Sequence, residues 1–320
     1  MTKEKENWLT KTWVVGLLAL FCCALWGSAF PMIKIGYRLF EIPAEDTAAQ
    51  ILFAGCRFTL AGIFAVLAGS AAGRKLLIPR RTSWAMVLKL SIFQTMLQYF
   101  LFYIGLANTT GVKASVIEGS NVFISILIAS LVFRMEKITW RKLAGCGLGF
   151  AGVVIINLGG GGMDLNFRLN GEGFILLSTV AYAISSVLSK RYSQKENPVT
   201  LSGYQFICGG IVMILTGLVL GGRLNRAGGQ GAAVLIYLAF LSAAAYSVWS
   251  ILLKYNPVSR VAVFGFSNPV FGVLLSALLL GEADQAKGVK SLIALVLVSA
   301  GIFIAQQERG MPKKAAMGKV

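Results

Sequence analysis

Residues 13–35 read WVVGLLALFCCALWGSAFPMIKI and contain a single charged side chain, Lys34. An α-helix rises about 1.5 Å per residue, so about 20 apolar residues cross the hydrocarbon core of a bilayer. This run is therefore long enough to span a membrane as one helix. It is too long for the apolar core of a signal peptide, and further apolar runs follow it, so we expect a helix that is retained in the mature protein.

Nine further apolar runs follow at residues 50–72, 84–107, 113–133, 140–158, 172–190, 200–221, 232–254, 258–280 and 289–306. Turn-forming segments such as Gly73-Arg74-Lys75, Asn197-Pro198 and Asn256-Pro257 separate them. Of the 320 residues, 56% are hydrophobic and 13% are charged, about half the charged share of a soluble domain. Together with a mean hydropathy of +0.73, these features predict an all-α integral membrane protein with ten transmembrane helices.

The Lys and Arg residues are distributed unevenly among the loops. If the N-terminus lies in the cytoplasm, 20 of them fall in cytoplasmic segments and eight in segments on the other side. Cytoplasmic loops are enriched in Lys and Arg, so the bias predicts an even number of spans in the cytoplasmic membrane, with both termini in the cytoplasm. Because the basic residues are spread over short loops, the net charge of +17 does not indicate a nucleic-acid partner.

Residue types that carry catalysis and metal binding are scarce. The chain has no histidine, and its five cysteines lie inside apolar runs without CxxC spacing. It also lacks the G-x-x-x-x-G-K-[ST] loop that binds nucleotide phosphates. We therefore expect no enzyme, no metal site and no bound cofactor, while coupling to protons or another ion stays open.

The two halves of the chain resemble each other at an offset of roughly 147–156 residues. The matched segments are Trp26 to Lys34 with Tyr182 to Lys190, Arg57-Phe58 with Gln205-Phe206, Tyr99 with Tyr246, Ser120-Asn121 with Ser267-Asn268, Glu136 with Glu282, and Ala151-Gly152 with Ala300-Gly301. Five runs per half is an odd number, so the second half would cross the membrane upside down. Inverted repeats are typical of secondary transporters, with a substrate site near mid-membrane where the halves meet.

These features resemble the drug/metabolite transporter superfamily, and within it the EamA-type permeases. The resemblance rests on Trp26-Gly27-Ser28-Ala29-Phe30, Arg57-Phe58, Tyr99 to Ala107, Glu136, residues 145–156, Asn268-Pro269 to Gly281-Glu282, and Ser299-Ala300-Gly301. It implies two inverted five-helix repeats, residues 13–158 and 172–306, between a cytoplasmic tail at residues 1–12 and a basic cytoplasmic tail at residues 307–320. The fourth run departs from the family, because Asn121-Val122-Phe123 stand where a proline is common.

Two charged side chains lie deep inside the runs. Arg57 is expected roughly 12 Å, and Glu118 roughly 9 Å, from the outer face. A charge at the bilayer centre costs roughly 2.5–3.5 kcal/mol on insertion scales, so it usually faces a cavity or a partner. Two interpretations stay open: an ion pair that locks two helices together, or contact of one charge with substrate or a coupling proton. Glu118 is the only carboxylate well inside a run, which makes it the candidate for proton coupling.

Further polar and aromatic side chains recur at helical spacing, which places them on one face of a helix. Lipid-facing stripes would be apolar, so we expect these faces to line the interior. The candidates for the substrate cavity, besides Arg57 and Glu118, are Trp26, Gln94, Gln98, Tyr99, Asn121, Tyr182, Ser185, Tyr246, Trp249 and Asn268. In the fifth run, Gly145, Gly149 and Gly152 favour close approach of another helix.

The sequence therefore predicts a secondary transporter that moves a small organic metabolite, such as an amino acid or related amphiphile, by alternating access. Export is favoured over uptake. The expected partners are the substrate and the lipid bilayer, and a homodimer stays open. The alternatives are a non-transporting sensor or assembly protein, which would need larger loops, and, less favoured, an integral-membrane enzyme, which would need clustered His, Asp or Cys.

Overall fold

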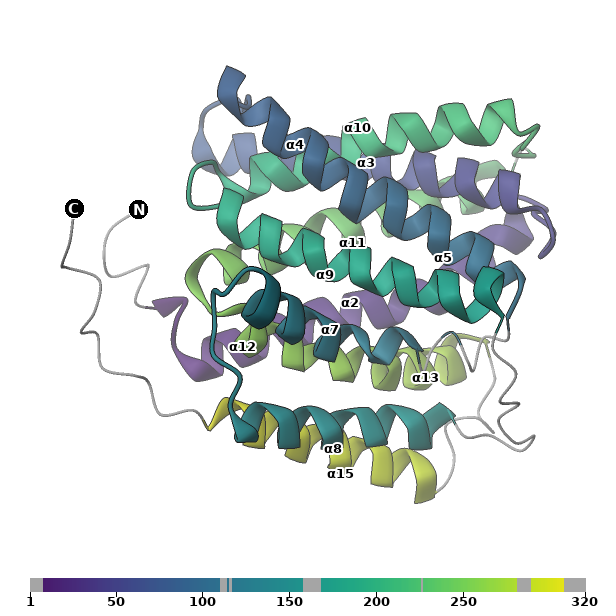
Figure 1. The fold of residues 1–320 in the computed structure, drawn as a ribbon. Helices are drawn as coiled ribbons and strands as arrows, with labels where there is room; N and C mark the ends of the chain where they lie inside the picture. The colour runs from purple at the N-terminus through teal and green to yellow at the C-terminus, as the bar shows by residue number, and fades with distance from the viewer. Residues whose placement is uncertain are drawn as a thin grey trace.

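The computed structural model describes residues 8–109, 114, 117–157, 168–225, 227–280 and 289–307. Within these ranges the regular secondary structure is helical, and no strand is present. The helices run roughly side by side in one bundle (Figure 1). The predicted all-α architecture is confirmed for the described part of the chain.

The elements follow one another along the chain with short connections. The first half contains α2 (Thr12–Leu39), α3 (Thr47–Gly73), η1 (Arg81–Ser83), α4 (Trp84–Leu90), η2 (Ser91–Leu97), α5 (Gln98–Ala107), α7 (Asn121–Leu127), η3 (Ile128–Val132) and α8 (Trp140–Asn157). The second half contains η4 (Leu169–Gly173), α9 (Phe174–Tyr192), α10 (Pro198–Val219), α11 (Gly228–Tyr255), α12 (Val258–Ala262), η5 (Val263–Phe266), α13 (Ser267–Leu280) and α15 (Val289–Gln306).

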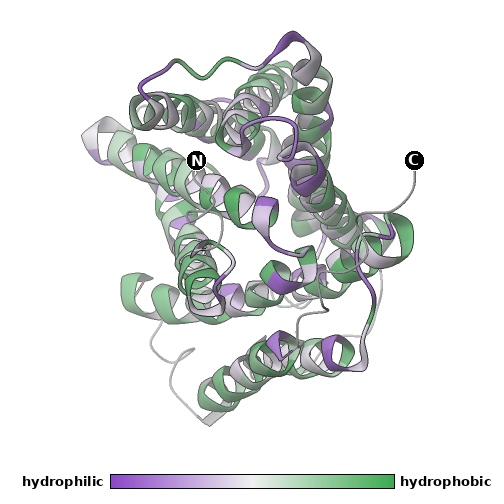
Figure 2. Cartoon of the chain, turned by 90° about the vertical axis from the view of Figure 1, so that its left-hand side faces the viewer, coloured by the Kyte–Doolittle hydropathy of each residue, from purple (hydrophilic) through white to green (hydrophobic). Residues whose placement is uncertain are grey.

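Among the described residues, six helical segments are long and apolar enough to cross a membrane. They are Thr12–Leu39, Thr47–Gly73, Arg81–Leu106, Leu169–Tyr192, Pro198–Val219 and Gly228–Tyr255, and two shorter apolar helices cover Ile117–Val132 and Leu292–Gln306. Figure 2 shows that most of the helical residues are hydrophobic and that hydrophilic residues gather at helix ends and in loops. Large exposed side chains such as Leu17 and Leu215 are suited to contact with lipid rather than water. The chain is thus a multi-pass membrane protein.

Local sequence signals set several helix ends. α3 begins where the Asp46 side chain accepts a hydrogen bond from the Ala49 N–H at 2.8 Å, and it ends at Arg74, which has a left-handed φ of 48°. α10 begins at Pro198, and the Asn197 side chain accepts from the Val199 N–H at 2.8 Å. Both are standard capping arrangements. The predicted turns at Gly73-Arg74-Lys75 and Asn197-Pro198 are confirmed, and Asn256-Pro257 separates α11 from α12.

Two helix pairs pack so closely that their backbones touch. A Cβ atom on Gly62 of α3 would meet the carbonyl oxygen of Gly203 on α10, and one on Gly55 would lie 2.6 Å from the Ile214 nitrogen. In the second pair, a Cβ on Gly145 of α8 would lie 2.6 Å from the Gly301 oxygen of α15. Figure 1 shows α3 beside α10 at the top and α8 beside α15 at the bottom. The close helix approach predicted for Gly145, Gly149 and Gly152 is confirmed.

α2 and α9 each pack against two helices of the other half of the chain. α2 lies against α11 and α13, and α9 lies against α5 and α7. Trp26 on α2 contacts two of the hydrophobic clusters that form the core, one centred on α2, α11 and α12 and the other on α3, α10 and α11. The middle of α2 is therefore where the packed groups of helices meet.

Candidate functional site

Aromatic rings from α2, α3, α5, α10 and α11 meet in the middle of the bundle. Trp26 packs edge-on against Tyr246 and Trp249, with ring centroids 5.2 and 4.9 Å apart. The hydroxyl groups of Tyr99 and Tyr246 are hydrogen-bonded at 3.1 Å, and both Tyr99 and Tyr182 pack against the cluster that contains Tyr246. The structure thus brings together five predicted site residues: Trp26, Tyr99, Tyr182, Tyr246 and Trp249.

Arg57 lies beside this aromatic centre and is 3% exposed. Its Nε donates a hydrogen bond to Ser242 Oγ on α11 at 3.1 Å, and its Cζ lies 5.1 Å from the centroid of the Phe58 ring. Tyr37, Tyr99, Tyr103 and Tyr246 lie close enough to interact with its charge. No carboxylate pairs with Arg57 in the described part of the chain.

The contacts that Arg57 makes in the described part of the chain do not compensate its charge. A cation–π contact contributes about 1–2 kcal/mol when desolvated, and a hydrogen bond to a neutral hydroxyl contributes about 1 kcal/mol. The desolvation of one buried ion costs several kcal/mol. The buried charge of Arg57 is therefore energetically unfavourable in the fold, and an anion bound beside it would be stabilised electrostatically.

Glu118 lies in the helix Ile117–Val132 and is partly buried. Its carboxylate has no hydrogen-bond or ion-pair partner among the described residues. The ion pair with Arg57 that the sequence left open is absent from the described structure. Equal depth does not make the two side chains neighbours. Tyr246 is close enough to interact with both charges.

Three other predicted residues keep a buried polar atom without a hydrogen-bond partner in the described structure: Trp26 Nε1, Gln98 Oε1 and Asn268 Oδ1. Buried polar groups are nearly always paired, so these three atoms are exceptions that a bound polar group would satisfy. Asn121 and Ser185 are instead engaged within their own helices. Asn121 Oδ1 accepts from Ser125 Oγ at 3.1 Å, and Ser185 Oγ donates to the Tyr182 carbonyl at 2.7 Å. Gln94 is 5% exposed on η2.

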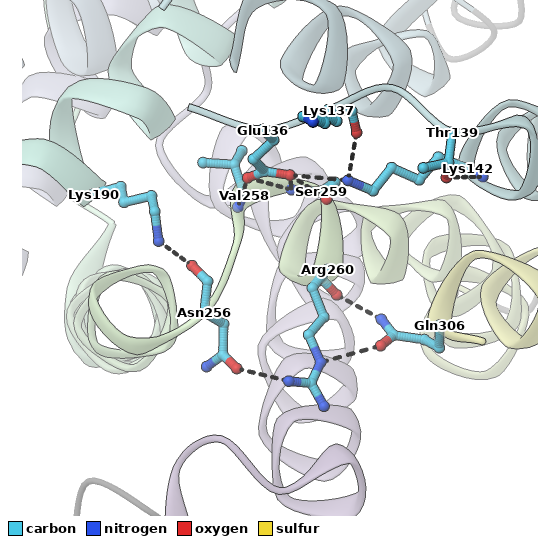
Figure 3. Close-up of polar contacts among 10 residues, drawn as sticks. All are labelled: Glu136, Lys137, Thr139, Lys142, Lys190, Asn256, Val258, Ser259, Arg260 and Gln306. Atoms are coloured by element: carbon cyan, nitrogen blue, oxygen red, sulfur yellow. Dashed lines mark hydrogen bonds and ion pairs between the residues drawn. The ribbon is translucent and has the colours of Figure 1, made fainter. Parts of the chain in front are cut away.

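A polar network around Glu136 connects helix ends and a loop at one end of the bundle (Figure 3). The Glu136 carboxylate accepts hydrogen bonds from the N–H groups of Val258 and Ser259 and from Ser259 Oγ. It also pairs with Lys142 Nζ at 3.4 Å, and both side chains are less than a tenth exposed. The loop after η3 therefore caps the N-terminus of α12, which lies far away in the sequence. A carboxylate at a helix N-terminus is favourable.

The same network reaches four other helix ends. Lys190 Nζ of α9 donates to the carbonyl oxygens of Leu253 and Asn256. Arg260 donates to Thr12 Oγ1 at 2.7 Å and to Gln306 Oε1 at 3.4 Å. The start of α2 and the end of α15 therefore lie at the same end of the bundle. We call Glu136, Lys142, Lys190, Asn256, Ser259, Arg260 and Gln306 the Glu136 network.

A loop carboxylate beside this network makes a further connection between the two halves. Glu196 accepts hydrogen bonds from Ser83 Oγ at 2.7 Å and from the N–H groups of Arg80 and Asn197 at 3.2 and 2.9 Å. Partial burial by itself raises the pKa of Glu196, but these hydrogen bonds outweigh it and hold the pKa below its ordinary value. Glu196 therefore stays ionised at neutral pH and keeps the connection.

Comparison with known proteins decides the family. The model of the EamA-like transporter family matches residues 13–158 and again residues 169–306. The chain belongs to the EamA-like transporter family. The resemblance to the drug/metabolite transporter superfamily that the sequence suggested is thereby confirmed.

Relatives of this EamA-like protein are named as transporters. An "Uncharacterized transporter" from Archaeoglobus fulgidus is 29% identical, covering 93% of this chain and all of the relative. A "Probable amino-acid metabolite efflux pump" from Salmonella typhimurium is 26% identical over 90% of this chain and 93% of the relative. An "S-adenosylmethionine/S-adenosylhomocysteine transporter" from Chlamydia muridarum is 29% identical over 59% of each chain. These relatives, which are named as transporters and not as enzymes, support a general role in transport.

A solved crystal structure has the same fold as this EamA-like chain. The two superpose with a TM-score of 0.72 over 91% of this chain and 96% of the other, at 20% sequence identity. This likeness concerns the fold alone.

Sequence reasoning about this EamA-like transporter missed two groups of residues. Tyr37 near Arg57 was not considered, and Tyr103, four residues after Tyr99, was noted only as an aromatic surface, because aromatic residues in membrane proteins are more often packing residues or interfacial anchors. The Glu136 network was also missed, although Glu136 and the Asn256-Pro257 turn were both visible. Nothing in the sequence says that a loop between two spans reaches a helix more than 100 residues away.

Proposed function

We propose that this EamA-like protein is a secondary transporter that moves a small organic metabolite, such as an amino acid or related amphiphile, across the cytoplasmic membrane by alternating access. Export is the favoured direction. In this proposal ten transmembrane helices form two inverted repeats, residues 13–158 and 172–306, with both termini in the cytoplasm. The substrate site is the aromatic centre between the repeats, beside Arg57 and Glu118.

The observation that carries the proposal is that residues matched between the halves by sequence also meet in space. Phe58 stacks on Phe206 with a centroid distance of 5.2 Å and an interplanar angle of 8°. Tyr99 is hydrogen-bonded to Tyr246. Residues related by a two-fold axis touch each other only where they lie next to that axis. These contacts support an inverted repeat whose axis passes through the aromatic centre.

Contacts away from the axis occur in exchanged pairs, which is further support. At the Arg57-to-Gln205 offset, Gly55 matches Gly203 and Gly62 matches Gly210. The backbone contact of Gly55 with Gly210 accordingly has its counterpart in the contact of Gly203 with Gly62. The packing of α2 on α11 and α13 is likewise matched by that of α9 on α5 and α7. Substrate sites of inverted-repeat transporters lie where the repeats meet.

The Glu136 network supplies the closed end that alternating access requires. Since Thr12 and Gln306 lie at this end, the Lys and Arg bias of the loops supports a cytoplasmic location for it. The counterpart of Glu136 in the second repeat is Glu282, which lies outside the described residues.

The Glu136→Gln variant is expected to loosen the cytoplasmic end. The amide cannot pair with Lys142, and it stabilises the N-terminus of α12 less than a carboxylate does. Amide hydrogen exchange in residues 253–262 should become about tenfold faster, because opening of the end costs less free energy. The matched control is Glu45→Gln, which changes an exposed loop carboxylate. Equal exchange rates in the two variants would show that Glu136 does not stabilise this end of the bundle.

The proposed function is tested by an untargeted comparison of metabolites inside and outside cells with and without the protein. Export of an amino acid or related amphiphile predicts that at least one such compound accumulates outside only when the protein is present. Identical metabolite profiles in cells that contain verified amounts of membrane-inserted protein would count against the proposal.

A further inference from the structure

We infer that Arg57, together with the tyrosine hydroxyls around it, is the subsite that binds the carboxylate group of the transported molecule. This inference rests on the proposed function, since it assigns one chemical group of the substrate to one residue of the proposed site. It commits the substrate to a class, that of small organic acids and zwitterions.

Most N–H groups of the Arg57 guanidinium have no hydrogen-bond acceptor in the described part of the chain. It carries five N–H groups in a planar fork, and the one hydrogen bond found for it in the described structure is that from Nε to Ser242 Oγ. The planar fork matches the two oxygens of a carboxylate. Tyr37 Oη is buried, and it lies beside the Tyr103 hydroxyl and close enough to interact with the Arg57 charge. An anion bound at Arg57 would therefore receive further hydrogen bonds from neighbouring hydroxyls.

The other half of the chain shows what this position needs for structure alone. Arg57 matches Gln205, and Ser242 matches Thr95 at the same offset that relates Tyr99 to Tyr246. The equivalent contact is present, since Thr95 Oγ1 donates to Gln205 Oε1 at 2.6 Å. The neutral amide of Gln205 thus connects α10 to η2, as Arg57 connects α3 to α11. A neutral side chain would therefore be enough to connect α3 to α11, and the positive charge of Arg57 is explained by a role in binding an anion.

The position of Glu118 extends the argument to zwitterions. Tyr246 interacts with the charges of both Arg57 and Glu118, and the two charged groups are not paired with each other. A zwitterion bound near Tyr246 would therefore lie within reach of both a cation and a carboxylate. The aromatic surfaces of Trp26 and Trp249 lie against the same region and suit an apolar part of the ligand.

The test compares amino acids with their amides, which keep the amino group but lack the carboxylate. Leucine, phenylalanine and threonine, and the amide of each, are titrated against purified full-length protein at pH 7 by isothermal calorimetry. The wild type should bind at least one acid about tenfold or more tightly than its amide, as expected for a charge-assisted hydrogen bond. In Arg57→Gln, which introduces the residue found at position 205, the preference should fall to within about twofold while the amide still binds.

The control is Ser242→Ala, which removes the hydrogen bond of Arg57 to α11 but keeps the charge, and it should retain the preference for the acid. An unchanged preference in Arg57→Gln, equal binding of acids and amides by the wild type, or no binding of any acid would overturn the inference. Transport of uncharged compounds by the same preparation would separate these failures from a failure of the proposed function. Circular dichroism of each variant verifies that the helices are intact.

Discussion

Substitution of Gly62 by leucine is expected to reduce the amount of folded, monodisperse protein about tenfold. The Cβ atom would meet the carbonyl oxygen of Gly203 and the side chain of Ile207, and neither α3 nor α10 can move away without separating Phe58 from Phe206. Overpacking of a tight core typically costs about 1–3 kcal/mol, and more where backbone atoms are in the way. Size-exclusion chromatography in mild detergent, combined with thermal melting, measures the effect.

The matched control is Gly147→Leu. Gly147 also lies inside a helix, α8, but a Cβ atom there has no neighbour within 4 Å. The same change of residue should therefore leave the chromatographic profile and the melting temperature close to those of the wild type. If both variants behaved alike, the close contact of α3 with α10 would not be what stabilises this part of the bundle.

Substitution of Glu118 by glutamine is expected to abolish substrate accumulation driven by a pH gradient. The amide has almost the same shape but cannot gain or lose a proton, and Glu118 has no partner among the described residues whose loss would disturb the fold. Accumulation in proteoliposomes with an imposed pH gradient should fall more than about tenfold, to the level reached without a gradient.

Substrate exchange without a gradient serves as the internal control for Glu118→Gln. Exchange requires binding and the conformational change but no net proton movement, so the variant should retain a substantial part of it. Gradient-driven accumulation at the wild-type level would show that the proton, if one is coupled, binds elsewhere.

The helical fold and the residues of the aromatic centre were predictable because both depend on patterns within single segments. An apolar run long enough to span a bilayer predicts a helix, and the spacing of Trp26, Tyr99, Tyr182 and Tyr246 predicts that they face inward. The match of Tyr99 with Tyr246 was also visible in the sequence, although their hydrogen bond was not.

The contacts between helices were much less predictable. The number of residues along a helix gives the depth of Arg57 and Glu118, but the lateral order of the helices decides which side chains meet. The Glu136 network shows the same limit, since it joins a loop after η3 to the N-terminus of α12. Such contacts depend on the packing of the whole bundle, which no local pattern encodes.

The most direct test of the central claim is movement of a solute by the purified protein itself. Liposomes containing the protein are loaded with a labelled panel of amino acids and related amphiphiles, and the release of each is compared with that from protein-free liposomes. The account predicts faster release of at least one compound, with release lost in Gly62→Leu and retained in Gly147→Leu. Release of every compound at the protein-free rate, from liposomes shown to contain folded protein, would contradict it.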